Sequence, residues 1–217
     1  MRRPRPKPPR STKSPTSPSN VRRPVAVAIT GGIGAGKTEA LRAFARLGAA
    51  TVSSDEIVHH LLRSDGDVKR AIVERLGEGV VDEEGAIDRA KVAERVFGDR
   101  EQLAWLESLL HPLVSREYLT WREQLAGLEQ PPEVSVTEVP LLYEAGSDDK
   151  FDAVVVITAP EAVRRRRTAV PLEQRSGRLI PDEEKVARAD YSYVNDGSKQ
   201  KLEAFVSSVL DELKERV

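Results

Sequence analysis

The 217-residue sequence contains no cysteine, so disulfides, thiolate metal sites and cysteine nucleophiles are excluded. It has no apolar run near the roughly 18 residues that a membrane-spanning helix needs, and we expect no membrane partner. The net charge of −1 gives no overall attraction to nucleic acid. With 39% hydrophobic and 32% charged residues, the composition is typical of a globular protein, and the length indicates one domain with room for a small insertion.

Acidic residues are missing from residues 1–22, which are rich in Pro, Ser, Arg and Lys. Such a segment buries too little apolar surface to offset its ordering entropy, so we expect a disordered tail. It has no apolar stretch of the kind found in secretory signals. A basic arm for nucleic acid or a membrane surface is the other interpretation. We assign the fold to residues 23–217.

The most informative stretch is residues 31–38, Gly-Gly-Ile-Gly-Ala-Gly-Lys-Thr, which fits the phosphate-binding pattern G-x-x-x-x-G-K-[ST]. Residues 25–30 before it are apolar and partly β-branched, as a buried parallel strand would be. Apolar residues follow at helical spacing, namely Ala40, Leu41, Phe44 and Leu47. The pattern therefore predicts a strand, a glycine loop and a helix.

A phosphate chain bound by such a loop needs bare backbone, because several N–H groups must converge on its oxygens. The helix that begins near Lys37 directs its positive dipole end at the same anion. Lys37 is placed to reach the β- and γ-phosphates, and the Thr38 hydroxyl to ligate magnesium. We expect ATP and Mg²⁺ as cofactors, held by Gly32, Ile33, Gly34, Ala35, Gly36, Lys37 and Thr38, with Thr38 as the metal ligand.

Further strands are predicted at residues 49–52, 134–139, 151–157 and 190–194. Together with the first strand they indicate an α/β fold with a parallel five-stranded sheet flanked by helices. Asp55 follows the second strand, where α/β sheets place their ligands. Two interpretations of Asp55 are open, a ligand contact or a carboxylate that only caps the next helix.

Residues from about 56 to 128 carry mostly helical periodicity and are too long for a simple crossover, so we expect a helical, acceptor-binding insertion. Pro112 should kink or restart a helix there. His111 is either a ligand contact or a histidine packed at that helix junction. Glu138, at the end of the third strand, is either an acid near magnesium or a structural partner for a basic residue.

Four consecutive arginines, residues 164–167, cover every side of a predicted helix, so at least one should point back over the phosphates. Arg175 and Arg178 follow in a stretch with Gly and Pro and little apolar content. We expect a short lid over residues 164–185, whose guanidinium groups neutralise charge during transfer. Asn195, Asp196 and Gly197 turn the chain into a terminal amphipathic helix.

These features in this order resemble the dephospho-coenzyme A kinase family of P-loop kinases, over roughly residues 25–217. The resemblance rests on residues 29–38, Asp55-Glu56-Ile57-Val58, Leu109-Leu110-His111-Pro112-Leu113-Val114, Val139-Pro140-Leu141-Leu142-Tyr143-Glu144, and Ala189-Asp190-Tyr191 with Asn195-Asp196-Gly197. It implies ATP-dependent phosphorylation of the ribose 3′-hydroxyl of dephospho-CoA, the last step of coenzyme A synthesis. A cytoplasmic enzyme is expected, a monomer or weak homo-oligomer, with a small-molecule substrate and no nucleic-acid or membrane partner.

The resemblance also implies site residues. Asp55 resembles the family's catalytic aspartate, which accepts or orients the proton of the 3′-hydroxyl, and Lys37 is expected to act in catalysis as well as in binding. Arg166 matches a lid-hinge arginine and Arg175 a second lid arginine. Asn195, Asp196 and Gly197 resemble the loop near the adenine, and His111, Leu142 and Glu144 resemble acceptor-side positions.

The sequence departs from the family pattern at two places. Ser53-Ser54-Asp55 stands where Asp-Ala-Asp is usual, and the lid is short, with Val170 where a second arginine is common. Another small-molecule kinase of the nucleoside or shikimate type, and a lid-degenerate paralogue with weak or no activity, are therefore alternatives. A GTPase-type switch protein is disfavoured because the chain has no Asn-Lys-x-Asp guanine signature.

Overall fold

A computed structural model describes residues 23–168 and 179–215. The expected tail and residues 169–178 of the expected lid, which include Arg175, lie outside the described residues. The chain divides into two compact units. The sheet unit comprises the described parts of Met1–Val52 and Arg122–Val217, and the helical unit is Ser53–Trp121.

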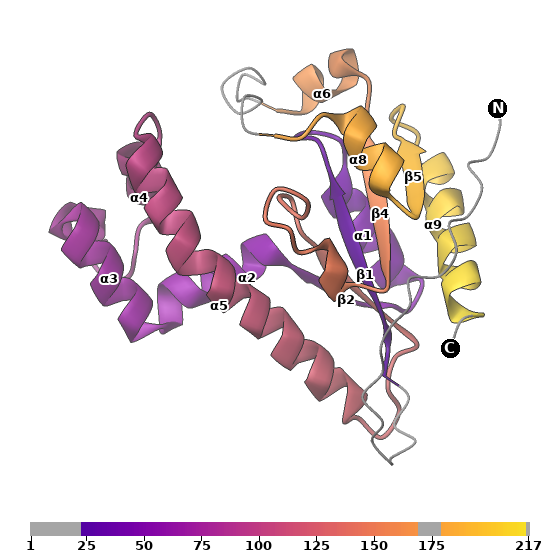
Figure 1. The fold of residues 1–217 in the computed structure, drawn as a ribbon, viewed down its shortest axis with the longest axis horizontal. Coiled ribbons are helices and arrows are strands. Elements are labelled where there is room, and N and C mark those ends of the chain that lie inside the picture. The colour runs from indigo at the N-terminus through magenta and orange to yellow at the C-terminus, as the bar shows by residue number, and fades with distance from the viewer. Residues whose placement is uncertain (1–22, 169–178, 216–217) are drawn as a thin grey trace. The chain divides into compact units, whose positions relative to one another are not determined.

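The sheet has five strands in the order β2-β3-β1-β4-β5 (Figure 1). They are β1 (Val25–Gly31), β2 (Ala50–Ser53), β3 (Val134–Glu138), β4 (Ala153–Thr158) and β5 (Tyr191–Val194). The strands run parallel, and Val27 of β1 pairs with Val136 on one side and Ala153 on the other. The predicted parallel α/β sheet is therefore confirmed, with strand ends within about two residues of those expected.

The three central strands are buried along almost their whole length, as their near-continuous apolar runs predict for a sheet covered on both faces. Helices α1 (Lys37–Arg46) and α9 (Lys199–Lys214) share one face of the sheet (Figure 1). Phe44 of α1 and Leu213 of α9 have 0% exposure in this core. This packing holds the end of β1 and the start of α1 in a fixed relation.

The chain after β4 forms α6 (Glu161–Arg167), and α8 (Asp182–Arg188) returns it to β5. Helix α8 packs against β4, on the side of the sheet away from α1. Sequence periodicity did not predict α8, whose seven residues are mostly charged. The segment between β3 and β4 contains the short 3₁₀ helix η2 (Asp148–Lys150).

The helical unit contains α2 (Ser54–Ser64), α3 (Gly66–Leu76), the 3₁₀ helix η1 (Glu78–Val80), α4 (Arg89–Val96) and the first part of α5 (Arg100–Ala126). Its core is apolar, with Ile72 and Val80 at 0% exposure. Asp65 and Asp88 cap α3 and α4 by accepting backbone N–H groups of the first turn. The predicted helical character of this block is confirmed.

Helix α5 runs without interruption through Pro112, so the alternative of a helix that restarts there is wrong. Proline costs a helix one hydrogen bond and crowds the preceding turn, but Pro112 is exposed on the helix surface. Leu110 and Val114, on either side of it, are buried, and their packing offsets that cost. His111 is also exposed in mid-helix, so the alternative of a histidine packed at a helix junction is wrong as well.

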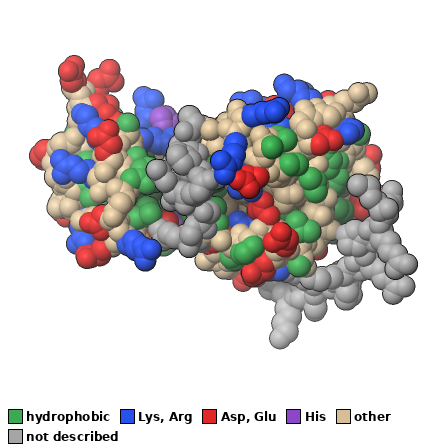
Figure 2. Space-filling model, turned by 90° about the horizontal axis from the view of Figure 1, so that it is seen from above, with side chains coloured by type: hydrophobic (Ala, Val, Ile, Leu, Met, Phe, Trp, Pro, Cys, Tyr) green, Lys and Arg blue, Asp and Glu red, His purple; other side chains and the backbone are tan. Residues whose placement is uncertain are grey.

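Acidic and basic side chains are interspersed over the face seen in Figure 2. No helix within residues 23–168 and 179–215 is both long and apolar enough to cross a membrane.

Candidate phosphate-binding site

The glycine loop joins the end of β1 to the start of α1, as the sequence pattern predicts. Gly36, the residue before α1, has φ 98°, a left-handed conformation that favours glycine. A Cβ atom at Gly31 would overlap the Ile157 carbonyl of β4, so close contact with the neighbouring strand requires glycine there. The loop is thus fixed against the sheet. Because its glycines have no side chains, its backbone is left uncovered at those positions.

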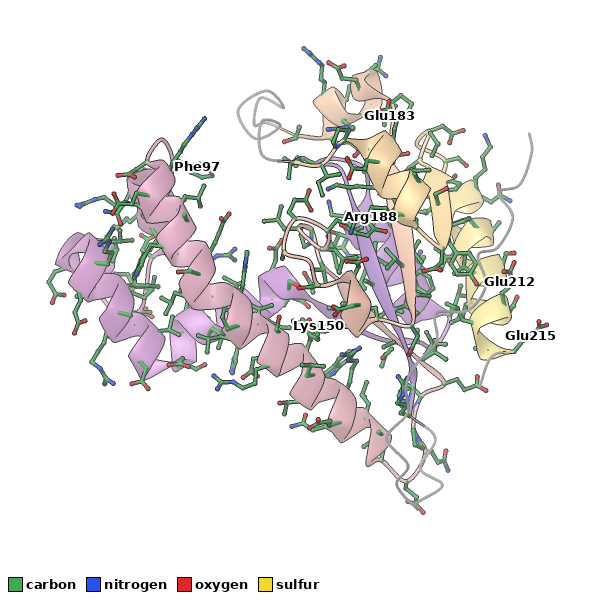
Figure 3. All side chains as sticks on the ribbon, viewed as in Figure 1. Phe97, Lys150, Glu183, Arg188, Glu212 and Glu215 are labelled. Carbon is green, nitrogen blue, oxygen red and sulfur yellow. The ribbon has the colours of Figure 1, made fainter. Side chains whose placement is uncertain are left out.

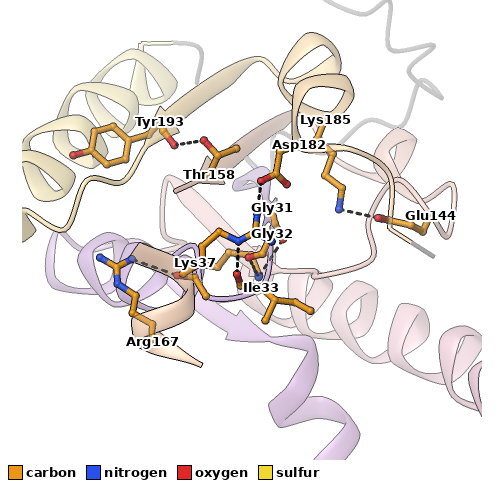
Figure 4. Close-up of polar contacts among 12 residues, drawn as sticks. Gly31, Gly32, Ile33, Lys37, Glu144, Thr158, Arg167, Asp182, Lys185 and Tyr193 are labelled. Atoms are coloured by element: carbon orange, nitrogen blue, oxygen red, sulfur yellow. Dashed lines mark hydrogen bonds and ion pairs between the residues drawn. The ribbon is translucent and has the colours of Figure 1, made fainter. Parts of the chain in front are cut away.

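Lys37 places its ammonium against this loop. Its Nζ atom donates to the Gly32 carbonyl at 3.0 Å and to the Gly31 carbonyl at 3.2 Å (Figure 4). A cation at this position neutralises phosphate charge brought to the loop, and the N-terminal end of α1 adds its dipole and N–H groups. The arrangement suits a bound polyphosphate.

Thr38 and Glu138 bring two oxygen groups together beside the loop. The Thr38 hydroxyl donates to a Glu138 carboxylate oxygen at 3.1 Å, and Glu138 is only 4% exposed at the end of β3. Hydroxyl and carboxylate oxygens are the ligands that Mg²⁺ prefers, so these residues fit the metal. Among the described residues there is no group of three or more His, Cys, Asp or Glu side chains that could hold a metal ion.

Asn195 braces the loop from the end of β5. Its Nδ2 donates to the Ala35 carbonyl at 2.8 Å, and its Oδ1 accepts the Gly197 N–H at 3.0 Å. A Cβ atom at Gly36 would overlap Nδ2, so the amide sits directly against the loop. Both ends of this side chain are therefore engaged within the protein. Sequence reasoning expected Asn195 near the nucleotide, and the structure adds that it supports the loop itself.

Asp196, beside Asn195, forms an exposed ion pair with Lys201, whose Nζ lies 2.7 Å from the Asp196 carboxylate. Hydrogen bonding from Lys201 lowers the pKa of Asp196, and the same bond raises the pKa of Lys201. The pair ties the Asn195–Gly197 turn to the first turn of α9. It thereby helps to hold Asn195 beside the loop.

Two of the four consecutive arginines contact the loop, as the helical argument predicts. Arg164 Nε donates to the Ile33 carbonyl at 2.9 Å, and Arg167 donates to the Gly34 and Ala35 carbonyls at 3.4 Å. These residues are three apart and share a face of α6. Arg165 pairs instead with Glu161 of its own helix, and Arg166 is exposed.

Arg164 also pairs with Asp182 at the start of α8, with 3.0 Å between NH1 and Oδ2. Helix α8 is anchored by Lys185, which is fully buried and lies 2.7 Å from the Glu144 carboxylate (Figure 4). Glu144 accepts the Ile180 N–H at 3.1 Å as well. The expected acceptor-side residue Glu144 therefore holds the start of α8, and its neighbour Leu142 is fully buried.

Asp55 belongs to the helical unit, in the first turn of α2. The helix cap is Ser53, whose hydroxyl accepts the Asp55 N–H at 3.2 Å, while Glu56 Oε2 accepts the Ser53 N–H at 3.2 Å. This capping box is complete without the Asp55 carboxylate, which is exposed. The structure therefore does not support the interpretation of the Asp55 carboxylate as the helix cap. Ser53 caps the helix instead, at a position where the family usually has an acid.

Comparison with known proteins decides the family. The dephospho-CoA kinase family model matches residues 25–201. The dephospho-CoA kinase of Protochlamydia amoebophila (strain UWE25) is 38% identical over 196 residues, covering 87% of this chain and 96% of that protein. The chain belongs to the dephospho-CoA kinase family.

Two solved structures are similar to this chain. The crystal structure of TT1252 from Thermus thermophilus aligns with a TM-score of 0.70 and 31% identity, covering 88% of this chain and 98% of that one. Dephospho-CoA kinase from Campylobacter jejuni aligns with a TM-score of 0.60 and 25% identity, covering 87% and 96%.

Sequence reasoning expected an arginine of residues 164–167 at the loop without singling out Arg164 and Arg167. It missed Asp182, which pairs with Arg164, and Lys185, which anchors α8. One signal was available, because Pro181 followed by three acidic residues is typical of a helix start. The individual contacts had no such signal. Which side of α6 faces the loop depends on how α6 packs, and a four-arginine run does not encode that.

Proposed function

We propose that this protein transfers the γ-phosphoryl group of ATP to the ribose 3′-hydroxyl of dephospho-CoA, giving coenzyme A and ADP. The observation that carries the proposal is the family match over a chain whose glycine loop holds Lys37 beside Thr38 and Glu138. In the reaction the 3′-oxygen forms a bond to the γ-phosphorus, and the bond from that phosphorus to the β–γ bridging oxygen breaks. The hydroxyl proton leaves to a base, and ADP carries away the bridging oxygen.

The loop residues act on the donor. Its N–H groups and the N-terminal end of α1 bind the phosphates, and Lys37 offsets their charge. Thr38 and Glu138 are the residues that would hold Mg²⁺, and the ion supplies charge neutralisation of the β- and γ-phosphates when it is bound. Asn195 keeps the loop in its binding conformation through the Ala35 carbonyl.

Asp55 acts on the acceptor in this proposal. Its carboxylate is exposed and is not needed by the capping box of α2. It orients the 3′-hydroxyl and takes its proton, a role in which position matters more than strong basicity because the transition state is loose. The roles assigned by resemblance to His111 and Arg175 are part of the same proposal.

A small molecule is therefore the proposed substrate, and the enzyme is proposed to act as a monomer or weak homo-oligomer. A cytoplasmic location belongs to the proposal because the reaction consumes ATP. The completed capping box argues against the degenerate-paralogue alternative, since Ser53 serves α2 rather than marking a lost site.

Acceptor choice tests the proposal. ADP release is measured with purified protein, ATP and Mg²⁺, and with dephospho-CoA, nucleosides or shikimate as acceptor. Of these acceptors, we expect only dephospho-CoA to raise ADP release above the rate without acceptor. We also expect ATP to be preferred over GTP as the phosphoryl donor. Faster release with a nucleoside or shikimate would replace this function with another small-molecule kinase activity.

A further inference from the structure

Arg164 lies against the phosphate-binding loop with both its guanidinium group and its backbone. A Cβ atom built on Gly32 would lie 3.1 Å from the Arg164 Cζ and NH1 atoms and 3.1 Å from Asp182 Oδ1. One on Gly34 would lie 3.1 Å from the Arg164 carbonyl oxygen. The guanidinium group and the backbone of Arg164 thus lie close to two glycines of the loop.

We propose that Arg164 is a phosphate-binding arginine of this enzyme, and that Asp182 is the positioning residue that sets the plane of its guanidinium group. The inference rests on the proposed function insofar as ATP is the donor. It assigns a phosphate contact to Arg164, whereas the family resemblance points to Arg166.

The hydrogen bonds of Arg164 support this role. Nε donates to Ile33 at 2.9 Å and NH1 to Asp182 at 3.0 Å, so contacts with described residues engage two of the five N–H groups of a guanidinium. Because the group is planar and rigid, two fixed donors determine where the remaining donors point. The Arg164 side chain is 20% exposed, so it is largely desolvated yet still reachable. These are the conditions under which a charge-assisted bond to phosphate is strong.

Asp182 is itself held firmly. It opens α8, and Lys185 one turn later is fully buried in its ion pair with Glu144. Arg188, one turn further, stacks over the Tyr143 ring with 4.1 Å between Cζ and the ring centroid. Helix α8 is therefore a fixed platform, and through Asp182 it orients Arg164.

Arg166 faces elsewhere. Two residues along an α-helix turn the side chain through about 200°, so Arg166 and Arg164 lie on nearly opposite sides of α6. Arg166 is exposed, whereas Arg164 is partly buried against the loop. Helix geometry thus separates the two candidates.

The test is a mutant cycle read by ATP binding in the presence of Mg²⁺ and without acceptor, using isothermal titration calorimetry on the full chain. Arg164→Ala should weaken ATP binding about tenfold or more, the loss expected for one hydrogen bond between charged groups. Arg166→Ala should weaken it less than threefold. Asp182→Asn should weaken it about threefold in the wild-type background and change it less than twofold in the Arg164→Ala background.

Glu183→Gln is the matched control, because Glu183 is exposed on the same helix and the charge change is identical (Figure 3). It should bind ATP as wild type does, and thermal melts verify that each variant is folded. If Arg164→Ala does not fold, Arg164→Lys replaces it. That variant keeps the charge but not the planar fork, so Asp182→Asn should again have less than a twofold effect beside it.

Three results would overturn the inference. They are a larger effect of Arg166→Ala than of Arg164→Ala, an equal effect of Asp182→Asn in both backgrounds, and tighter ATP binding by Asp182→Asn, which would make Asp182 only a repelling charge. If the wild type binds ATP but leaves dephospho-CoA unmodified, the proposed function fails while this binding cycle still decides the inference. If the wild type does not bind ATP, both fail.

Discussion

The Lys185 ammonium lies 2.7 Å from the Glu144 carboxylate, with the lysine side chain 1% exposed and that of Glu144 13% exposed. Replacing Lys185 by Met removes one partner of a buried pair and strands the other charge. We expect a loss of about 3 kcal/mol in the free energy of unfolding, the lower end for a broken buried pair because Glu144 keeps some solvent contact. Urea denaturation measures it.

The double variant Lys185→Met/Glu144→Gln is the companion experiment. It removes the stranded charge and keeps an oxygen for the Ile180 N–H, so it should be more stable than Lys185→Met alone. Single and double losses that simply add would show that the two side chains are not coupled.

Glu138 and Thr38 give a prediction about magnesium. Glu138→Gln replaces a carboxylate by a neutral amide of the same shape, so the enzyme should need roughly tenfold more Mg²⁺ for half-maximal activity. Thr38→Ser keeps the hydroxyl and serves as the control, with little change expected. An activity curve against Mg²⁺ that does not move in Glu138→Gln would remove Glu138 from the metal site.

Variants of Asp55 and of its neighbour Glu56 distinguish a catalytic role from a helix-capping role. Asp55→Asn should lower kcat by about 10²-fold or more, the range of a general acid–base group, and leave ATP affinity nearly unchanged. Glu56→Gln weakens the capping box, so it should cost up to about 1 kcal/mol of stability with kcat within threefold of wild type. Normal turnover by Asp55→Asn would leave Asp55 without a chemical role.

Asp152 links β1 to β4 and gives a prediction about acid stability. Its carboxylate accepts hydrogen bonds from Arg23 at 2.8 and 2.9 Å and from the Ala26 N–H at 2.9 Å. Burial raises the pKa of Asp152, but the bonds from Arg23 and Ala26 lower it further, and the net pKa lies below its ordinary value. The unfolded chain therefore binds the proton more readily. The stabilisation is complete above the unfolded pKa, near 4, and is lost as the pH falls through the lower folded pKa.

Asp152→Asn should accordingly lower stability by about 1 kcal/mol at pH 7, a small figure because the Arg23 side chain is 63% exposed. The difference from wild type should shrink as the pH falls below about 4, where the unfolded chain takes up the proton at Asp152 before the folded protein does. Asp149→Asn, an exposed neighbour, controls for net charge. Thermal melts at several pH values measure both, and a constant difference down to pH 2 would contradict the assignment.

Much of this fold was predictable because buried apolar residues recur in the sequence in the patterns typical of strands and helices. The apolar runs of β1, β3 and β4 and the glycine loop indicated a parallel sheet with a loop between β1 and a helix, and the structure contains both the sheet and that loop. Helix α8 has no such apolar pattern, because Lys185 is the one buried residue among its seven and that residue is charged. A pairing such as Lys185 with Glu144 depends on the folded path of the chain rather than on local sequence.

The candidate site likewise contains residues that the sequence predicted and residues that only the folded structure identified. The loop residues and Thr38 follow from one contiguous pattern, and the structure places them together. The continuous helix through Pro112 was missed because tertiary packing of Leu110 and Val114 overrides a local penalty. Arg164 could not be singled out among four arginines until the packing of α6 was known.

The central claim is that ATP phosphorylates dephospho-CoA at the ribose 3′-oxygen. The most direct measurement incubates wild-type protein with ATP, Mg²⁺ and dephospho-CoA and follows the products by phosphorus NMR and mass spectrometry, with Lys37→Ala as the control impaired in both nucleotide binding and turnover. The account predicts one coenzyme A, carrying a new 3′-phosphomonoester, for each ADP formed by the wild type. Unchanged dephospho-CoA, or a phosphate attached at another position, would contradict it.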